Sequence, residues 1–271
     1  MSRYAVIGKP VKHSKSPQIH TLFAKQTGQD LSYSAEEVEE EDFESYVASF
    51  FSGGGGGLNI TVPHKERAFA VAKLCSDRAN LARAVNTLYL DQDGHLCGDN
   101  TDGAGLVRDI TENHRFEIRN KRILLLGAGG AVRGVLAVLA EQQPASITLV
   151  NRTLSRAQQL QREFVKLVTL KVQSYEGLQE QVFDLVINGT SSSLSGELPP
   201  ISPAMLAAQC CCYDMMYSDQ DTAFVAWSKA QGATLALDGI GMLVEQAAES
   251  FEIWRGVRPA TTQIIDGLRA K

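Results

Sequence analysis

The sequence predicts an α/β protein with two domains, one of which is built on a doubly wound parallel sheet. From about residue 123 onward, short apolar runs alternate with helical stretches, which is the pattern of βαβ crossovers. The first of these runs, Ile123–Leu126, leads directly into the glycine-rich turn 127–131 and then into an apolar helix. The first hundred residues lack this rhythm, so we expect a separate N-terminal α/β domain with its own core.

The N-terminal region is expected to begin with a strand, a helix and a second strand, before the pattern becomes irregular. Strands are expected at 4–8 and 31–38. The helix between them should start at Ser16-Pro17, with Ser16 as the N-cap and the proline in the first turn. The acidic run 36–42 is expected to open a second helix that ends near Phe51.

Five consecutive glycines, Gly53 to Gly57, come next. Because glycine is the least constrained residue, the run predicts a flexible turn, with a hinge that closes over a substrate as the alternative. The other elements expected before the second domain are strand 58–63, helix 68–74, a short helix near Leu81, strand 85–90, a hairpin turn at 91–94, strand 95–98 and a helix opened by 99–103.

The second half of the chain carries the regular alternation. We place the change of domain in the helix near 103–116, and we expect two helices at the C-terminal end, 241–254 and one after Pro259. The strand candidates are 123–126, 147–150, 168–172, 185–187, 211–215 and 234–237.

Composition restricts the class of function. The 271 residues are 44% hydrophobic and 21% charged, which is ordinary for a globular protein. The net charge of −5 argues against nucleic acid or an anionic membrane as the main partner. No apolar segment reaches the roughly 20 residues that span a bilayer, and the first residues lack a secretory apolar region, so a cytoplasmic location is expected.

The five cysteines predict small buried hydrophobes rather than a metal site. Their number is odd, and no Cys-x-x-Cys spacing occurs. Cys210, Cys211 and Cys212 are consecutive, so in a strand they would point to alternate faces and could not share one ion. No His/Cys/Asp cluster has metal-ligand spacing, and no metal is expected.

The glycine-rich turn predicts a dinucleotide site. Gly127 and Gly129 permit a tight turn and let backbone N–H groups approach a pyrophosphate, which the following helix N-terminus also favours. The alternative is a strand–helix turn that binds nothing. The residues expected at the cofactor are Gly127, Ala128, Gly129, Gly130 and Ala131.

The end of the next strand indicates which cofactor is bound. An NAD-selective site generally places an acidic residue there, and this chain has Asn151-Arg152-Thr153 instead, with Arg156 one turn further along. A guanidinium suits a 2′-phosphate by charge and by geometry. NADP is therefore preferred over NAD, the alternative being a solvent-exposed basic helix start.

Polar clusters follow several strands of the first domain. Taken singly, Ser16 and Asp102 could be N-caps, Asn59 a turn former and Lys65 a surface charge. Together with motifs of the second half they resemble the shikimate dehydrogenase family, in that family's order and over nearly the whole chain. The motifs are Ser14-Lys-Ser-Pro17, Asn59-x-Thr-Val-Pro-x-Lys65, Asn86-Thr87, Asn100-Thr-Asp-Gly103, Gly127-Ala-Gly-Gly-Ala131, Asn151-Arg-Thr153, Tyr213-Asp-Met215 and Asp238-Gly-x-Gly-Met-Leu-Val-x-Gln246.

The resemblance implies reversible reduction of 3-dehydroshikimate to shikimate by NADPH, in the route to aromatic amino acids. It implies an N-terminal substrate domain, 1–102, closed by returning C-terminal helices, 239–271, around a Rossmann-like NADP-binding domain, 103–238. Lys65 and Asp102 would be the catalytic pair, and Gly241 would lie close to the nicotinamide. The residues implied to bind substrate are Ser14, Ser16, Asn59, Thr61, Lys65, Asn86, Asp102, Tyr217 and Gln246.

The implied chemistry is physically consistent. Hydride delivery to a ketone builds negative charge on oxygen, which a protonated lysine can stabilise and then neutralise, while a neighbouring carboxylate orients the ammonium. Three features depart from the family pattern: the five-glycine run, the bulky Val132, and Ser218–Asp221, which lacks the proline often found there. They put affinity more in doubt than activity.

Two other functions remain open from sequence. One is a quinate/shikimate dehydrogenase that uses NAD or NADP, against which Arg152 argues. The other is a non-catalytic NADP-binding sensor, which would need neither Lys65 nor Asp102. A small-molecule substrate, no nucleic-acid or membrane partner, and a monomer or homodimer are expected.

Overall fold

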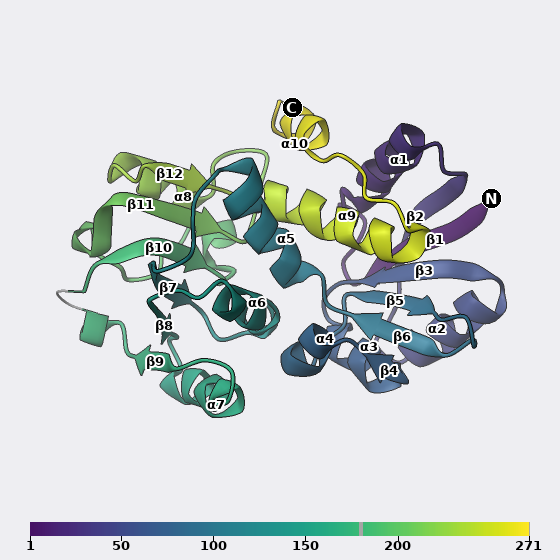
Figure 1. Ribbon diagram of the computed structural model, residues 1–271, viewed down its shortest axis with the longest axis horizontal. Coiled ribbons are helices and arrows are strands. Elements are labelled where there is room, and N and C mark those ends of the chain that lie inside the picture. Colours follow the sequence, from purple (N-terminus) through teal and green to yellow (C-terminus); the bar gives the residue numbers. More distant parts are fainter. Residues whose placement is uncertain (179–180, 271) are drawn as a thin grey trace. The chain divides into compact units, whose positions relative to one another are not determined.

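The computed structural model describes residues 1–178 and 181–270 as two compact units (Figure 1). The first unit contains Met1–Gly105 and Val244–Gly267, and the second contains Leu106–Leu243 and residues 268–270. Each unit has its own six-stranded sheet. No helix among the described residues is long and apolar enough to cross a membrane.

The first unit is a mixed sheet with strand order β2-β1-β3-β5-β6-β4. β1 pairs in parallel with β2 and β3, whereas β5 is antiparallel to both β3 and β6. Its strands are β1 (Ser2–Gly8), β2 (Leu31–Glu37), β3 (Gly55–Ile60), β4 (Leu74–Cys75), β5 (Thr87–Leu90) and β6 (Leu96–Asp99). The helices are α1 (Ser16–Thr27), α2 (Phe43–Ser52), α3 (Lys65–Val71) and α4 (Asp77–Ala82), followed near the C-terminus by α9 (Ile240–Arg255) and α10 (Thr262–Arg269).

Two details at the start of this unit differ from expectation. Ser16 is not the N-cap of α1, because Lys15 already has helical φ and ψ of −80° and −7°. The hydroxyl of Ser14 instead accepts the Ser16 N–H at 3.2 Å. The acidic run 36–42 does not open a helix either: Glu36 and Glu37 complete β2, and α2 begins only at Phe43.

The five-glycine run is the main correction to the predicted fold. Only Gly53 and Gly54 form a turn, whereas Gly55, Gly56 and Gly57 begin strand β3. A Cβ atom on these three would lie 2.1 Å from the Phe50 ring, 2.7 Å from the Tyr4 ring and 2.4 Å from the Trp254 indole, respectively. The strand therefore lacks side chains because aromatic rings from other elements fill their places.

The second unit is the predicted doubly wound parallel sheet, with order β12-β11-β10-β7-β8-β9. In chain order this is 3-2-1-4-5-6, the arrangement of dinucleotide-binding folds, and the direction of strand addition reverses between β7 and β10. Its strands are β7 (Arg122–Leu126), β8 (Ser146–Val150), β9 (Leu170–Gln173), β10 (Phe183–Asn188), β11 (Leu206–Asp214) and β12 (Leu235–Leu237). The predicted fold class is confirmed.

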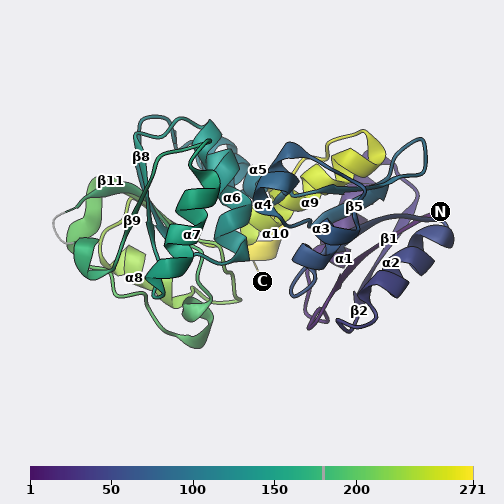
Figure 2. The ribbon, with the colours of Figure 1, turned by 90° about the horizontal axis from the view of Figure 1, so that it is seen from below.

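Helices cover both faces of this second sheet (Figure 2). Right-handed crossovers place α6 (Gly130–Glu141) and α7 (Leu154–Phe164) on one face and α8 (Ala223–Ala230) on the other. Shorter segments are α5 (Asp102–Arg108), a π-helix η1 (Asp109–Asn113), and 3-10 turns η2 (Glu176–Leu178), η3 (Ser192–Ser195) and η4 (Pro203–Met205). Cys210, Cys211 and Cys212 are fully buried free thiols in β11, as predicted.

Candidate functional site

The strand arrangement of the first unit collects its polar motifs at one edge of the sheet. β1 and β3 are parallel and end together, since Ile7 pairs with Ile60. The loop that carries Ser14 follows β1, and Thr61 follows β3, where its N–H donates to the carbonyl of Ile7 at 3.0 Å. Antiparallel β5 starts at this same edge, because Asn59 pairs with Thr87.

Lys65 and Asp102 form a close ion pair at this edge. Lys65 is the first residue of α3 and Asp102 the first of α5. Lys65 Nζ lies 2.5 Å from Asp102 Oδ2, and their side chains keep 27% and 11% of their exposure. The pair is thus accessible but largely screened from bulk water, the setting in which a charge-assisted hydrogen bond is strong.

Asn86 holds the second oxygen of Asp102. Its Nδ2 donates to Asp102 Oδ1 at 2.8 Å and to Gln246 Oε1 at 3.2 Å. Its Oδ1 accepts a hydrogen bond from the backbone N–H of Thr101 at 2.9 Å. Because an N–H group can only donate, the amide atom that faces it must be the oxygen. This contact fixes the orientation of the amide, so both oxygens of the Asp102 carboxylate have defined partners.

The loop before Asp102 is anchored by a buried ion pair. Arg78 contacts both oxygens of Asp99, at 2.7 and 2.9 Å. Burial alone would raise the pKa of Asp99, but the Arg78 guanidinium, the Ser76 hydroxyl and the Asn100 N–H together outweigh it and the pKa is lowered. Asp99 then accepts the N–H of Asn100, whose side chain accepts the N–H of Asp102 at 3.2 Å.

The side-chain amide of Asn59 forms hydrogen bonds with other residues of the protein. Its Nδ2 donates to Ser250 Oγ at 3.0 Å and to Thr87 Oγ1 at 3.2 Å, and its Oδ1 accepts the Tyr33 hydroxyl at 2.7 Å. Ser250 Oγ also lies 3.3 Å from Thr101 Oγ1. A continuous chain of hydrogen bonds therefore runs from Tyr33 to the Lys65–Asp102 pair.

Sequence reasoning missed two members of this chain, Tyr33 and Ser250. Ser250 lies one helical turn after Gln246, so its i+4 spacing on α9 was the available signal. Tyr33 carried none. It stacks on the buried ring of His20, with centroids 4.1 Å apart and planes 5° apart. Burial lowers the pKa of His20 to about 3, so this ring is neutral.

The glycine turn of the second unit lies at the point where strand order reverses. Gly127 has a φ of +107°, which favours glycine, and its Cβ would meet the carbonyl of Gly189 at 3.2 Å. Cβ atoms on Gly129 and Gly130 would meet nothing within 4 Å, so the backbone at the start of α6 faces open space. The bulky Val132 is accommodated because its neighbour is Gly189, where a Cβ would come within 2.3 Å of it.

The residues after β8 present two exposed arginines. Arg152 and Arg156 are exposed, and within the described chain neither guanidinium forms an ion pair. Asn151 Nδ2 donates to the carbonyl of Thr153 at 2.8 Å, which shapes the turn. Thr153 occupies the N-cap position of α7, but its side chain makes no capping bond there. The positive charge is thus available at the carboxyl end of a Rossmann strand.

Two predicted residues lie elsewhere in the second unit. Tyr217 follows β11 and is partly buried, which raises the pKa of its hydroxyl. Gly241 is in the first turn of α9, where a Cβ would be 2.0 Å from Asp109 Oδ1. The structure thus joins Lys65, Asp102, Asn86, Asn59 and Gln246 by hydrogen bonds in the first unit, and places Tyr217 and the cofactor residues in the second.

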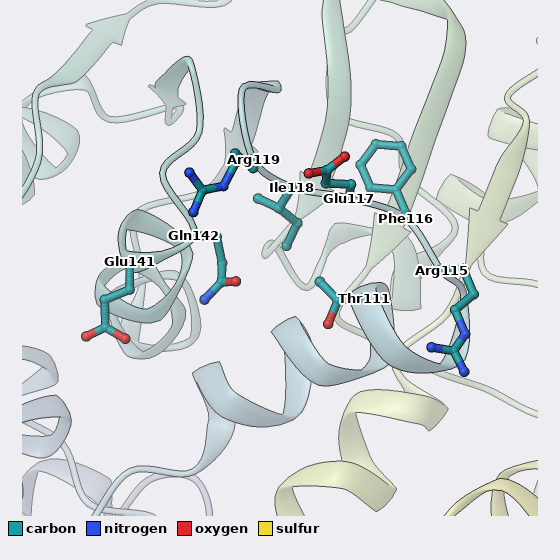
Figure 3. Close-up of a pocket in the computed structure, with 8 residues that line it drawn as sticks. All are labelled: Thr111, Arg115, Phe116, Glu117, Ile118, Arg119, Glu141 and Gln142. Atoms are coloured by element: carbon teal, nitrogen blue, oxygen red, sulfur yellow. The ribbon is translucent and has the colours of Figure 1, made fainter.

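A separate hollow in the second unit is not the predicted site. It has a volume of about 370 Å³ and none of its lining residues was predicted to bind substrate or cofactor. Figure 3 shows the side chains around it, which come from the segment after α5 and from the end of α6. They are Thr111, Arg115, Phe116, Glu117, Ile118, Arg119, Glu141 and Gln142.

One acidic group in the described chain has ligand atoms close enough for a metal ion. Asp91, Asp93 and His95 lie at the hairpin between β5 and β6, with their ligand atoms within 4.8 Å of one another. Asp91 already accepts the backbone N–H groups of Asp93 and His95, at 2.9 and 2.8 Å. Its carboxylate therefore stabilises the turn, as Asp commonly does.

Comparison with known proteins identifies the family of this chain. Three family models match: the shikimate dehydrogenase substrate binding domain (residues 6–88), shikimate/quinate 5-dehydrogenase (109–195), and the shikimate 5′-dehydrogenase C-terminal domain (239–266). A shikimate dehydrogenase (NADP(+)) of Aeromonas hydrophila is 54% identical over 269 residues, covering 99% of this chain and 98% of the relative.

Solved structures are similar over the same extent. The Ael1 enzyme of Pseudomonas putida has a TM-score of 0.93 and 46% identity, covering 99% of this chain and 98% of that one. Shikimate 5-dehydrogenase of Thermus thermophilus, in complex with NADP(H) and shikimate, has a TM-score of 0.88 and 30% identity, covering 100% and 99%. The chain belongs to the shikimate dehydrogenase family.

Proposed function

We propose that this chain catalyses the reversible, NADPH-dependent reduction of 3-dehydroshikimate to shikimate in the biosynthesis of aromatic amino acids. The observation that carries the proposal is the Lys65–Asp102 pair, 2.5 Å apart and held from the other side by Asn86. A family member that only sensed NADP would need no such pair. The first unit then serves as the substrate domain and the second as the cofactor domain.

In this reaction NADPH, when bound, supplies the hydride. The Lys65 ammonium donates a hydrogen bond to the ketone oxygen, stabilises the negative charge that develops there, and transfers a proton to the resulting alkoxide. Asp102 holds the ammonium in place and accepts a hydrogen bond from the neighbouring substrate hydroxyl. Asn86 keeps the Asp102 carboxylate oriented through its 2.8 Å contact.

The carboxylate of the substrate is proposed to bind at the start of α1. Ser14 and Ser16 lie there, and the helix N-terminus contributes partial positive charge. Thr61, just after β3, and Gln246 would hold the ring and its hydroxyls, and Tyr217 would also approach the substrate. Because its amide is engaged with Tyr33, Thr87 and Ser250, we assign Asn59 chiefly to holding the site together.

The cofactor is proposed to bind along the second sheet. The open backbone at Gly129 and Gly130 fits a pyrophosphate at the N-terminus of α6, with Gly127, Ala128 and Ala131 shaping the turn. Arg152 and Arg156 suit the 2′-phosphate that distinguishes NADP from NAD, with Asn151 and Thr153 beside them. Gly241 is proposed to lie near the nicotinamide.

The proposal is tested by the change in nicotinamide absorbance with shikimate or quinate as substrate, each with NADP⁺ or NAD⁺. We expect the highest kcat/KM for shikimate with NADP⁺. Faster oxidation of quinate with NAD⁺ would instead identify a quinate/shikimate dehydrogenase. Binding of NADP⁺ without turnover of either substrate would identify a sensor.

We further infer that the protein works in the cytoplasm on a small-molecule substrate, without nucleic acid or membrane, as a monomer or homodimer. The net charge of −5 supports the absence of nucleic-acid and membrane partners, since such a partner favours a basic surface. Size-exclusion chromatography with light scattering distinguishes one copy from two, and a larger assembly would contradict the inference.

A further inference from the structure

Asp109 is a fully buried carboxylic acid that takes no part in the proposed chemistry. It begins η1, a single π-helical turn after α5, and π-helical turns are frequent at functional sites. Its Oδ1 accepts a hydrogen bond from Asn113 at 2.9 Å, and His114 Nε2 lies 3.7 Å away. Burial raises the pKa of Asp109 and lowers that of His114. Burying an ionised carboxyl group is costly unless it is paired and hydrogen-bonded, so the partners of Asp109 matter.

Asp109 is connected to the start of α9 through one buried hydroxyl. The Tyr213 hydroxyl donates to Asp109 Oδ2 at 2.7 Å and accepts the backbone N–H of Met242 at 3.2 Å. Tyr213 and Asp109 are both fully buried. The N–H groups in the first turn of a helix lack partners within the helix, so the phenol supplies one that α9 cannot provide itself.

The carboxylate also determines which residue can stand at 241. A Cβ atom there would lie 2.0 Å from Asp109 Oδ1 and 2.2 Å from Oδ2, so any side chain at 241 would force the buried carboxylate to move. The backbone of Gly241 therefore passes directly against the Asp109 carboxylate, and the next residue is held by Tyr213. The Asp109 carboxylate and the Tyr213 hydroxyl thus fix the backbone of two consecutive residues, Gly241 and Met242.

We propose that Asp109 and Tyr213 are positioning residues of the cofactor site, which place the Gly241–Met242 backbone where the nicotinamide ring binds. This rests on the proposed function, which puts Gly241 beside the nicotinamide. Neither residue touches the cofactor in this account; both act through the backbone of α9. Their loss should therefore disturb the nicotinamide end of the cofactor and leave the adenosine end unaffected.

The test compares Tyr213→Phe with a matched control, Ser228→Ala. Ser228 is also buried in the second unit, and its hydroxyl donates to the carbonyl of Phe224 at 2.8 Å within α8. Three quantities are measured for each protein: the rate of hydride transfer in a single turnover with shikimate and NADP⁺, the Kd of adenosine 2′,5′-bisphosphate, which lacks the nicotinamide, and the Tm.

We expect Tyr213→Phe to slow hydride transfer about 10- to 100-fold, the range for a reacting group displaced by a fraction of an ångström to an ångström. Its Kd for adenosine 2′,5′-bisphosphate should equal that of the wild type, and Ser228→Ala should transfer hydride at the wild-type rate. An unchanged rate in Tyr213→Phe, or an equal loss of bisphosphate binding, overturns the inference. Failure of the proposed function would give a different result from failure of this inference, because the wild-type protein would then not oxidise shikimate at all.

A measurement on the wild-type protein removes dependence on folding of the variants. Amide hydrogen exchange at Met242 should be slow in the free protein, because its N–H is buried and bonded to Tyr213. Exchange as fast as at an exposed first-turn amide overturns the inference without any substitution. Asp109→Asn, which keeps the side-chain shape, serves as the second variant and should slow hydride transfer in the same way.

Discussion

Asp102 contacts Lys65 with one carboxylate oxygen, at 2.5 Å, and Asn86 with the other, at 2.8 Å. The two contacts have different consequences. The first keeps an ammonium at the edge of the sheet where the substrate motifs gather. The second prevents rotation of the carboxylate, because the Asn86 amide is itself fixed by the N–H of Thr101. The pair is therefore preorganised before substrate arrives, which is the condition for effective electrostatic catalysis.

Replacing Arg152 with alanine should reduce the preference for NADP⁺. The guanidinium pairs with the 2′-phosphate in the proposed complex, so kcat/KM with NADP⁺ should fall about 10-fold or more, as for loss of one charge-assisted contact, while the value with NAD⁺ stays the same. Arg162→Ala is the matched control, because Arg162 is exposed near the far end of α7, the helix that follows Arg152. An unchanged ratio of the two kcat/KM values would remove Arg152 from the phosphate site.

Replacing Gly57 with alanine should destabilise the first unit. The added methyl group would lie 2.4 Å from the Trp254 indole, and overpacking of this kind costs about 1–3 kcal/mol. Gly267→Ala is the control with the opposite sign: it lies in α10 with no atom within 4 Å of the new Cβ, so alanine should stabilise the helix by about 0.5–1 kcal/mol. Urea unfolding measures both changes. Equal stability of Gly57→Ala and wild type would contradict the packing described for β3.

Stability should fall on acidification because of His20. Its pKa in the folded protein is about 3, below the 6.5 of an unfolded histidine, so between these values the unfolded chain binds more protons. The contribution of neutral His20 to the free energy of unfolding is fully present above pH 6.5. It is lost as the pH falls toward 3, at up to about 1.4 kcal/mol per pH unit.

The variant His20→Phe isolates this effect. Phenylalanine retains the stack on Tyr33 but cannot bind a proton, so its unfolding free energy should fall less steeply between pH 6.5 and 4 than that of the wild type. The difference between the two urea-unfolding curves at each pH is the quantity to compare. Parallel curves would show that His20 titrates normally.

The sequence was sufficient to predict the second sheet, because its strands are buried on both faces and therefore appear as continuous apolar runs. It was misleading at Gly55–Gly57. The packing of that strand comes from Tyr4 and Trp254, which are remote in sequence, so only the low strand propensity of glycine was visible. Ser16 failed as an N-cap for a local reason: the preceding Lys15 already has helical φ and ψ, so Ser16 lies inside the first turn of α1.

The predicted site residues were found through motifs, and those without a motif were missed. Lys65, Asp102, Asn86 and Gln246 prove to be joined by hydrogen bonds. Tyr33 and Ser250 contact Asn59 across 26 and 191 residues, respectively, so no local pattern could reveal these contacts, although the i+4 spacing from Gln246 was a signal for Ser250 itself. Tyr213 belongs to a motif, but its contact with the buried Asp109 could not be foreseen, since 104 residues separate the two.

The central claim is that Lys65 transfers the proton, giving it to the alkoxide in the reduction and taking it from the shikimate hydroxyl in the oxidation, and the most direct measurement is kcat of Lys65→Ala with shikimate and NADP⁺. We predict a fall of about 10²-fold or more, the contribution of a positioned acid–base group, with the Kd of NADP⁺ unchanged. Lys229→Ala, which removes an exposed lysine paired with Asp221, should retain wild-type kcat. Turnover by Lys65→Ala at the wild-type rate would contradict the account.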